Sequence, residues 1–350
     1  MNHEIKIGNR VLSENSGTYI IAEMSGNHNM DYNRAVEIIH AAKEAGADAI
    51  KVQTYTADTI TLNCDDPCFQ ITQGTLWDGT TLYKLYEKAY TPWDWQPKLK
   101  EVAEGLGLDF FSSPFDFTSV DFLEKMDVPA YKIASFEITD IPLIKKVALL
   151  GKPVIISTGI ATIEDIELAL DTCKKAGNEN VILLKCCSAY PTPYEDINLN
   201  TMVDIAKKFD CVVGLSDHTM GDAVAVASVA MGAKVVEKHM TLRRADGGVD
   251  SAFSMEPEEF KRMVDNIRIV EKAKGKVTYE LAPKQKAERE YARSLFIAAD
   301  LKAGDTLTPD NLRSVRPANG LHTKYYEELL GKKVTRDVRY GEPASWDMIE

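Results

Sequence analysis

Cysteines and long apolar runs are both scarce in this sequence. The six cysteines among 350 residues show no paired C-x-x-C spacing, which argues against a structural zinc site and predicts free thiols. No segment approaches the ~20 apolar residues that a transmembrane helix needs, and residues 1–10 lack the apolar centre of a signal peptide. These absences predict a cytoplasmic protein that binds no membrane.

Positive charge and a common nucleotide-binding motif are missing as well. The chain has 41 basic and 53 acidic side chains, and the net charge of −12 argues against a nucleic-acid-binding surface. An anionic substrate would therefore need a local basic pocket. No G-x-G-x-x-G motif follows the first predicted strand, which counts against a dinucleotide-binding open sheet.

Short apolar runs alternate with helical patterns along most of the chain. Helical patterns such as residues 33–46 and 162–177 have apolar residues at spacings of three and four and a glycine at the end. Such alternation is typical of a parallel sheet covered by helices. Eight units over about 250 residues predict a (β/α)8 barrel, with a doubly wound open sheet as the alternative. The predicted strands lie within residues 18–25, 47–54, 108–115, 130–135, 153–159, 180–188, 212–218 and 234–240.

The composition changes towards the C-terminus. We predict the barrel domain for residues 1–280, a charged linker for 281–292, and a small β-rich domain with short strands and turns for 293–350. Within the barrel, residues 56–90 are too long for an ordinary connection between a strand and a helix. We expect this segment, which contains Trp77, to cover the barrel mouth.

Polar side chains occur near the C-terminal end of almost every predicted strand. In a barrel of this type those ends converge on one active-site mouth, whereas the interior is packed with apolar side chains. Packing alone does not explain a complete ring of polar residues. The ring consists of Glu23, Lys51, Gln53, Ser112, Ser113, Lys132, Ser135, Glu137, Ser157, Thr158, Lys185, Ser188, Ser216, His218, Glu237, Lys238 and His239.

Two residues of this ring are histidines on the last two predicted strands. Because those strands are neighbours, the imidazoles of His218 and His239 can converge on one ion. Two imidazoles suit a divalent transition metal whose other ligands are water and substrate. The alternative is that each histidine donates a proton or contacts the substrate directly.

Two further ring residues are lysines. Lys51 and Lys132 are expected to bind anions, because a buried and unpaired ammonium is costly. The serines around them would complete a cradle for a phosphate and a carboxylate on one small molecule. A Schiff base on one lysine, as in a class I aldolase, is the alternative. The serines of this cradle are Ser135, Ser157, Ser188 and Ser216.

The sequence leaves more than one role possible for each of three carboxylates. Glu23 and Glu137 can act as general bases, accept hydrogen bonds from hydroxyl groups, or pair with the neighbouring lysines. Asp250 follows the last strand in a loop that contains glycines. There it can bind sugar hydroxyls or an amide, or it can simply form a turn.

Nine short motifs run along nearly the whole chain: IAEMSGNH, IKVQTY, FFSSPFD, YKIAS, ISTGIAT, YPTPYEDINL, GLSDHT, EKHMTL and VRPANG. In this order they resemble those of the sialic acid synthase family. The tail resembles the antifreeze-like (SAF) domain of that family. The resemblance implies a transferase that condenses phosphoenolpyruvate with an N-acylated amino sugar to a nine-carbon 2-keto acid. It also implies a divalent cation (Mn²⁺, Mg²⁺ or Co²⁺) and a domain-swapped homodimer, in which the small domain caps the partner's barrel.

The resemblance also assigns roles to individual residues. It places a metal on His218 and His239, and it makes Glu23 a residue for water or proton handling. Ser188 departs from the pattern, because neuraminate synthases have an asparagine at this phosphoenolpyruvate contact. The catalytic set would be Glu23, Lys51, Lys132 and Glu137. The phosphoenolpyruvate set would be Lys51, Lys132, Ser135, Ser157 and Ser216, and the sugar set Gln53, Glu137, Tyr190, Asp250 and, from the other subunit, Arg316.

Two segments, residues 74–96 and 244–255, most resemble the pseudaminic acid synthase branch. That resemblance implies 2,4-diacetamido-2,4,6-trideoxy-L-altrose as the sugar. A methyl group at its C6 would suit an apolar lid formed by Trp77, Tyr83 and Trp93. The alternatives are an N-acetylneuraminate or legionaminate synthase that uses another N-acetylated hexose, a metal-dependent aldolase or sugar isomerase, and a non-catalytic sugar-binding module.

Overall fold

The computed structural model describes residues 4–350 and contains two compact units, Met1–Gly275 and Lys276–Glu350. The first unit holds a closed barrel of eight parallel strands in the order β10-β3-β4-β5-β6-β7-β8-β9. The predicted (β/α)8 barrel is therefore confirmed, and the open sheet is excluded. The barrel strands are β3 (Tyr19–Glu23), β4 (Ala49–Thr54), β5 (Asp109–Pro114), β6 (Tyr131–Ile133), β7 (Val154–Ser157), β8 (Val181–Lys185), β9 (Val212–Asp217) and β10 (Val235–His239).

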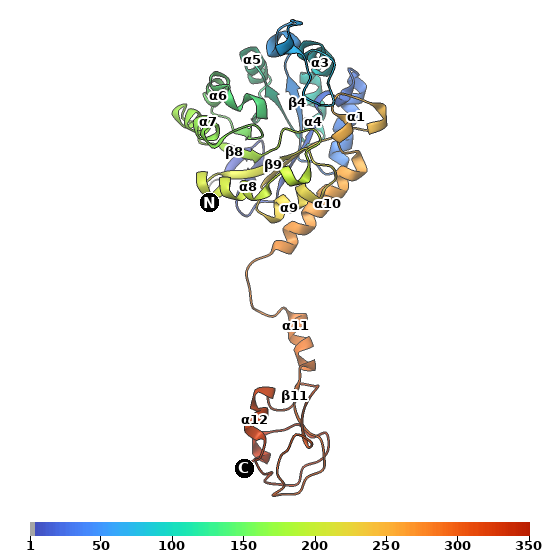
Figure 1. Ribbon diagram of the computed structural model, residues 1–350, viewed down its shortest axis with the longest axis vertical. Coiled ribbons are helices and arrows are strands. Elements are labelled where there is room, and N and C mark those ends of the chain that lie inside the picture. Colours follow the sequence, from blue (N-terminus) through green and yellow to red (C-terminus); the bar gives the residue numbers. More distant parts are fainter. Residues whose placement is uncertain (1–3) are drawn as a thin grey trace. The chain divides into compact units, whose positions relative to one another are not determined.

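Helices follow the barrel strands and surround them (Figure 1). At the start of α1 the side chain of Asp31 accepts hydrogen bonds from two backbone N–H groups of the first turn, and Thr162 caps α7 by a similar bond. Gly46 and Gly177 follow these two helices with φ of 89° and 81°, a conformation that glycine adopts readily. The helices are α1 (Tyr32–Glu44), α2 (Ala57–Ile60), α3 (Leu82–Ala89), α4 (Gln96–Gly105), α5 (Phe117–Lys125), α6 (Ile141–Ala148), α7 (Ile163–Lys175), α8 (Leu199–Phe209), α9 (Ala223–Ala230) and α10 (Pro257–Lys274).

The barrel strands are almost wholly buried, which explains their near-continuous apolar sequence. Their polar residues gather at the C-terminal ends, where β3 ends at Glu23 and β10 ends at His239. Ser135 and Glu137 are an exception, because β6 ends at Ile133. Both residues belong to the short 3-10 helix η3 (Ser135–Thr139), so a turn rather than a strand positions them.

A short antiparallel hairpin, β1 (Ile5–Ile7) and β2 (Arg10–Leu12), covers the N-terminal ends of the barrel strands. Its buried apolar residues belong to the same hydrophobic core as the barrel. Arg10 lies 2.6 Å from Asp48 (Nη1 to Oδ1), the residue that directly precedes β4. The hairpin therefore closes the end of the barrel opposite the mouth, a feature that the sequence pattern did not predict.

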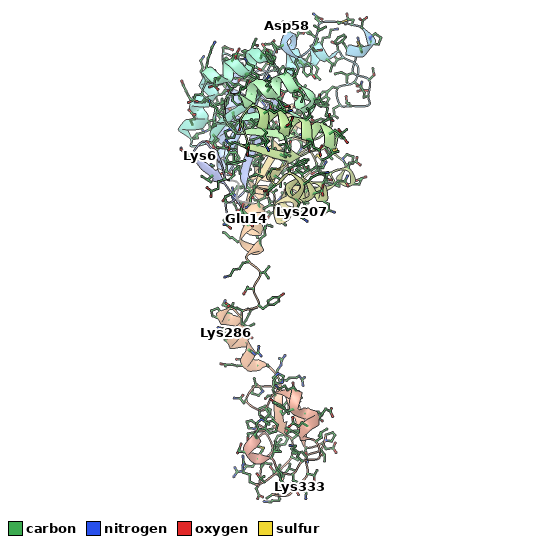
Figure 2. All side chains as sticks on the ribbon, turned by 90° about the vertical axis from the view of Figure 1, so that its left-hand side faces the viewer. Lys6, Glu14, Asp58, Lys207, Lys286 and Lys333 are labelled. Atoms are coloured by element: carbon green, nitrogen blue, oxygen red, sulfur yellow. The ribbon has the colours of Figure 1, made fainter. Side chains whose placement is uncertain are left out.

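The segment between β4 and α4 contains α2, the 3-10 helix η2 (Pro67–Phe69) and α3. Its Trp77 donates a hydrogen bond from Nε1 to the carbonyl of Val249 (2.8 Å), and the Trp77 ring lies 5.6 Å from that of Tyr190. The segment thus reaches the loops that follow β8 and β10. Figure 2 shows its Asp58 at the opposite end of the unit from Glu14, which follows the hairpin.

The second unit contains α11 (Pro283–Glu288), an antiparallel pair β11 (Ser294–Ile297) and β12 (Leu312–Val315), and α12 (Tyr326–Leu329). It has a hydrophobic core of its own, so it folds as a separate body. In neither unit is any described helix long and apolar enough to span a membrane. The core residues are Leu295, Ile297, Leu307, Leu312, Leu329, Val334, Val338, Ala344 and Met348.

The close packing of the barrel wall can be tested at Gly214 in β9. A Cβ there would lie 2.2 Å from the carbonyl oxygen of Val235 and 2.7 Å from Cδ2 of Leu184. Gly214→Ala is therefore expected to lower the free energy of unfolding by about 1–3 kcal/mol in urea titrations. The matched control is Gly105→Ala, since Gly105 ends α4 with no atom within 4 Å of its added Cβ. The control is expected to stabilise by ~0.5–1 kcal/mol; equal behaviour of the two variants would contradict the packing described.

Candidate active site

Two lysines and two carboxylates occupy the centre of the barrel mouth. Lys51 Nζ lies 2.7 Å from Oε2 of Glu23 and 3.6 Å from Oε1 of Glu237. Lys132 Nζ lies 3.8 Å from the same oxygen of Glu237. All four side chains are at most 4% exposed. Glu237 thus lies between the two ammonium groups and attracts both.

Burial and charge act in opposite directions on these groups. Burial disfavours charge on Lys51, but the carboxylates of Glu23 and Glu237 outweigh burial and raise the Lys51 pKa. For Lys132 burial dominates and lowers the pKa, with Glu237 opposing it. Burial also raises the pKa of Glu23, whereas Lys132 and Lys51 overcome burial at Glu237 and hold its pKa low. Lys132 is therefore the cation with the least compensation, and an anionic ligand would stabilise its charge.

Serine hydroxyls surround the two lysines. Ser157 Oγ accepts a hydrogen bond from Lys132 Nζ (2.7 Å), and Ser113 Oγ accepts one from Lys51 Nζ (3.3 Å). Ser216 donates to Oε1 of Glu237 (3.0 Å) and so adds a third partner to that carboxylate oxygen. The hydroxyls thus order the charged groups before any substrate binds.

Ser188 lies against Ser135. The Ser188 hydroxyl donates to Ser135 Oγ (2.7 Å), and the backbone amide of Ile160 donates to the same oxygen (3.1 Å). With both acceptor positions used, the Ser135 hydroxyl keeps its own proton for a ligand. Gly159 permits this arrangement, because a Cβ there would lie 2.3 Å from Ser188 Oγ and 2.5 Å from Ser135 Oγ.

The two histidines lie side by side, with ring centroids 5.2 Å apart. Nδ1 of His218 is 3.1 Å from the carbonyl of Cys187, and because a carbonyl only accepts, this nitrogen carries the proton and Nε2 has a free lone pair. Burial lowers the pKa of His218 to about 4, and burial together with His218 lowers the pKa of His239 well below its usual range. Both rings are therefore neutral at physiological pH, as metal ligands must be.

Further observations bear on a metal at this place. Nδ1 of His239 is buried without a hydrogen-bond partner. Within residues 4–350, no three histidine, cysteine or carboxylate side chains are grouped as a complete metal site. The donor set fits a divalent transition metal only if water and substrate supply the remaining ligands. The rings of Tyr190 and Phe253 line the pair, at 4.5 Å from His218 and 5.0 Å from His239.

A buried ion pair holds the ends of β9 and β10 together. Lys238 and Asp217 are both 0% exposed, and Lys238 Nζ lies 2.7 Å from Asp217 Oδ2. Lys238 also donates to the carbonyl of Thr219 (2.5 Å), whose amide in turn donates to Asp217 Oδ1 (2.9 Å). Asp217 precedes His218 and Lys238 precedes His239. Lys238 is therefore a structural cation that sets the positions of the two imidazoles.

The remaining barrel residues of the predicted site lie beside this centre. Gln53 Nε2 donates to Glu23 Oε1 (3.0 Å) and to Ser25 Oγ (3.2 Å), and the Ser25 hydroxyl donates to Oδ2 of Asp250. Oε2 of Glu137 is buried without a hydrogen-bond partner. Burial raises the pKa of Glu137 to about 7, against the opposing effect of Lys132. A carboxyl group with this pKa can both accept and release a proton near neutrality.

The three aromatic residues expected in the lid make contacts in different places. Trp77 reaches Tyr190, as described above, but Tyr83 donates its hydroxyl to Asp58 (3.0 Å) within the lid segment. Trp93 donates to the carbonyl of Tyr55 (3.0 Å), and its ring packs on Phe122 of α5 at 4.9 Å. Trp77 reaches the loops that follow β8 and β10, whereas Trp93 contacts the residue that follows β4. Beside Trp77 and Tyr190, Phe253 adds an aromatic ring that the sequence pattern does not single out.

The sequence pattern assigns no specific role to two other residues of the site, Glu237 and Ser25. The sequence pattern marks Glu237 only as a strand-end residue. It lies two positions before His239, and residues two apart in a strand point to the same face. Ser25 ends the predicted strand segment 18–25, but the sequence pattern gives it no role. Arg316 belongs to the second unit, where it is exposed and its side chain makes no hydrogen bond or ion pair with residues 4–350.

The closed barrel and its strand-end cluster define an enzyme of the sialic acid synthase type. The chain belongs to the NeuB family, whose model matches residues 38–279, and the SAF domain model matches residues 292–350. Both the predicted family and the predicted antifreeze-like domain are confirmed.

The relatives include a pseudaminic acid synthase from Campylobacter jejuni (strain 81-176), 46% identical over 97% of this chain and 98% of that protein. An N,N'-diacetyllegionaminic acid synthase from Legionella pneumophila is 35% identical over 95% of this chain and 94% of that protein. Among solved structures, the N-acetylneuraminic acid (sialic acid) synthetase from Leptospira borgpetersenii in complex with citrate has a TM-score of 0.74 at 32% identity, covering 82% of this chain and 95% of that one.

Proposed function

We propose that this protein is a pseudaminic acid synthase. It would condense phosphoenolpyruvate with 2,4-diacetamido-2,4,6-trideoxy-L-altrose and water, and release a nine-carbon 2-keto acid and inorganic phosphate. The observation that carries the reaction class is the pair Lys51 and Lys132, held on one carboxylate beside two neutral imidazoles. The identity of 46% to a pseudaminic acid synthase, against 35% to a legionaminic acid synthase, favours this sugar.

Phosphoenolpyruvate would bind with its negative charges at Lys51 and Lys132. Ser135 would donate its free hydroxyl proton, and Ser157 and Ser216 would hold Lys132 and Glu237 in place. Binding an anion here restores the charge balance that burial disturbs at Lys132. The lysines then stabilise the phosphate throughout the reaction, including its departure.

The chemistry starts when C3 of phosphoenolpyruvate attacks C1 of the open-chain sugar aldehyde. Positive charge develops at C2, water adds there, and the resulting phosphate hemiketal breaks its C–O bond to release inorganic phosphate. Glu137 is proposed to take the proton of the attacking water, since burial raises its pKa to about 7. Glu23 is the second candidate for proton handling, although its bond with Lys51 also gives it a structural role.

His218 and His239 would hold a divalent cation, with Mn²⁺, Mg²⁺ and Co²⁺ as candidates. When bound, the cation would polarise the carbonyl of the sugar as a Lewis acid. The chain itself prepares the two imidazoles for this role. The Cys187 carbonyl sets the tautomer of His218, and the Lys238–Asp217 pair fixes the strand ends that carry both rings.

We further propose that the protein acts as a homodimer in which the second unit of each chain caps the partner's barrel. Large apolar side chains are exposed on the loops and helix starts that follow the barrel strands. They belong to Phe117, Phe136, Ile160, Tyr194 and Met220, which are 40–57% exposed. A surface of this kind suits a second copy of the chain. The exposed and unpaired Arg316 would then bind the sugar in the partner's site.

The sugar and the reaction class can be tested together. Phosphoenolpyruvate is incubated with a panel of diacetamido and monoacetamido hexoses, and phosphate release and product mass are measured. The diacetamido altrose is expected to give the fastest release, and isotopically labelled water should place its oxygen at C2 of the keto acid. Label found only in phosphate would contradict C–O cleavage, and a faster monoacetamido hexose would favour a neuraminate synthase.

The metal assignment predicts the behaviour of His218→Ala. Turnover with Mn²⁺ and the affinity for Mn²⁺ should both fall at least about a hundredfold, because one of two protein ligands is lost. The melting temperature of the metal-free protein should stay close to that of the wild type. His40→Ala is the control, since His40 is exposed on α1. Unchanged Mn²⁺ affinity in His218→Ala would remove the metal from this place.

The dimer predicts that Arg316→Ala raises the KM for the sugar more than the KM for phosphoenolpyruvate. Arg313→Ala, on an exposed arginine of β12, should leave both constants near the wild-type values. Mixing Arg316→Ala with the inactive His218→Ala should restore activity, because a mixed dimer contains one complete site. Absence of recovery after subunit exchange, verified by mass, would contradict the swap.

A further inference from the structure

Ser25 has a backbone conformation that its side chain disfavours. It lies two residues after Glu23, the last residue of β3, opens the 3-10 helix η1 (Ser25–His28), and has φ of 47°. In this left-handed region the Cβ of an L-residue is crowded, and glycine is the residue usually found there. Ser25 is only 2% exposed, so contact with solvent does not explain the serine. Its hydroxyl must make contacts that outweigh the unfavourable backbone.

The Ser25 hydroxyl connects two residues of the proposed sugar site. It donates a hydrogen bond to Oδ2 of Asp250 and accepts one from Gln53 Nε2 (3.2 Å). The same amide of Gln53 donates to Glu23, which pairs with Lys51. A continuous chain of polar contacts therefore runs from a lysine of the proposed phosphoenolpyruvate site to Asp250.

The backbone of the Asp250 loop has other supports that do not involve Ser25. Ser254 Oγ donates to the carbonyl of Asp250 (2.7 Å), and Asn27 Nδ2 donates to Ser254 Oγ (2.8 Å). Trp77 holds the carbonyl of Val249. Among these contacts, only that of Ser25 is made to the Asp250 carboxylate itself. Ser25 thus orients the side chain of Asp250, whereas the other contacts place its main chain.

We propose that Ser25 is a positioning residue for the amino sugar. Its hydroxyl holds the Asp250 carboxylate and the Gln53 amide in the orientation that receives hydroxyl or acetamido groups of the substrate. This proposal rests on the sugar-binding role given to Asp250 and Gln53 under the proposed function. A carboxylate that already accepts one bond from the protein is fixed in orientation, and a fixed acceptor discriminates better between sugar epimers.

The same contact affects the charge of Asp250. Burial raises the pKa of Asp250 to about 6, and the Ser25 hydroxyl opposes this rise by donating to the charged form. The nearby titratable groups are the phenols of Tyr55 and Tyr190, both of which the Asp250 charge reaches. Without the hydroxyl the pKa should rise further. As the pH falls, the carboxyl group of such a variant would be protonated earlier than in the wild type. Sugar binding, which needs the charged carboxylate, would then weaken at a higher pH.

Two variants separate the hydroxyl from the backbone. Ser25→Gly removes the hydroxyl and relieves the backbone, whereas Ser25→Ala removes the hydroxyl and keeps the crowded Cβ. Both should raise the KM for the sugar about tenfold or more, as expected for a lost bond to a charged group, and leave the KM for phosphoenolpyruvate within about twofold. Both should also move the acidic limb of the sugar KM to higher pH. Ser25→Gly should melt at a higher temperature than Ser25→Ala.

The control is Ser251→Ala, because Ser251 is buried in the same loop and donates to the carbonyl of Gly248 rather than to Asp250. It should leave the sugar KM and its pH limb unchanged. If Ser25→Gly and Ser25→Ala alter only the melting temperature, the proposal is wrong and Ser25 is structural.

Failure of the proposed function gives a different result. The KM values are measured with whichever sugar of the panel the wild type turns over, so a different substrate does not affect the comparison. If no sugar is turned over, the proposed function fails by itself. Titration of the Asp250 carboxyl by NMR then decides the role of Ser25: a pKa that does not rise in Ser25→Gly overturns the proposal.

Discussion

The barrel mouth depends on one carboxylate that two buried cations share. Lys51 and Lys132 lie on different strands, and each would be costly to bury alone. Oε1 of Glu237 lies 3.6 Å from one ammonium and 3.8 Å from the other, and Ser216 holds it with a hydrogen bond. The carboxylate lowers the repulsion between the two cations and keeps both at the place where an anionic substrate would bind. At Lys132 the carboxylate does not fully offset the cost of burying the charge. An anionic substrate that binds there would therefore gain additional binding energy.

The two sides of the site differ in how they are built. His218 directly follows β9 and His239 ends β10, and the Lys238–Asp217 pair between these strands is wholly buried. Asp250 lies in the loop after β10 and Ser25 in the short turn of η1 after β3, and both are held by side-chain hydrogen bonds. Chemistry that all members of a family share is best served by rigid strands, whereas loops can change with the substrate. The proposed sugar specificity therefore belongs to the loop side of the mouth.

Much of the fold could be predicted from the sequence, because each strand of a covered parallel sheet is a distinct apolar run. The strand-end polar residues followed from the same geometry, and the histidines are neighbours as expected. The role of Glu237 could not be predicted, since it depends on which lysines face it across the barrel. The role of Ser25 could not be predicted either, because it depends on a positive φ and on a contact with a residue 225 positions away. The hairpin β1–β2 is too short to show a pattern.

The hairpin β1–β2 also determines how ligands reach and leave the site. It seals the lower end of the barrel, so ligands enter and leave through the mouth beneath the segment that carries Trp77. Under the proposed chemistry phosphate is released beside the two lysines that bind phosphoenolpyruvate. Retained phosphate should therefore compete with incoming phosphoenolpyruvate for the same cradle.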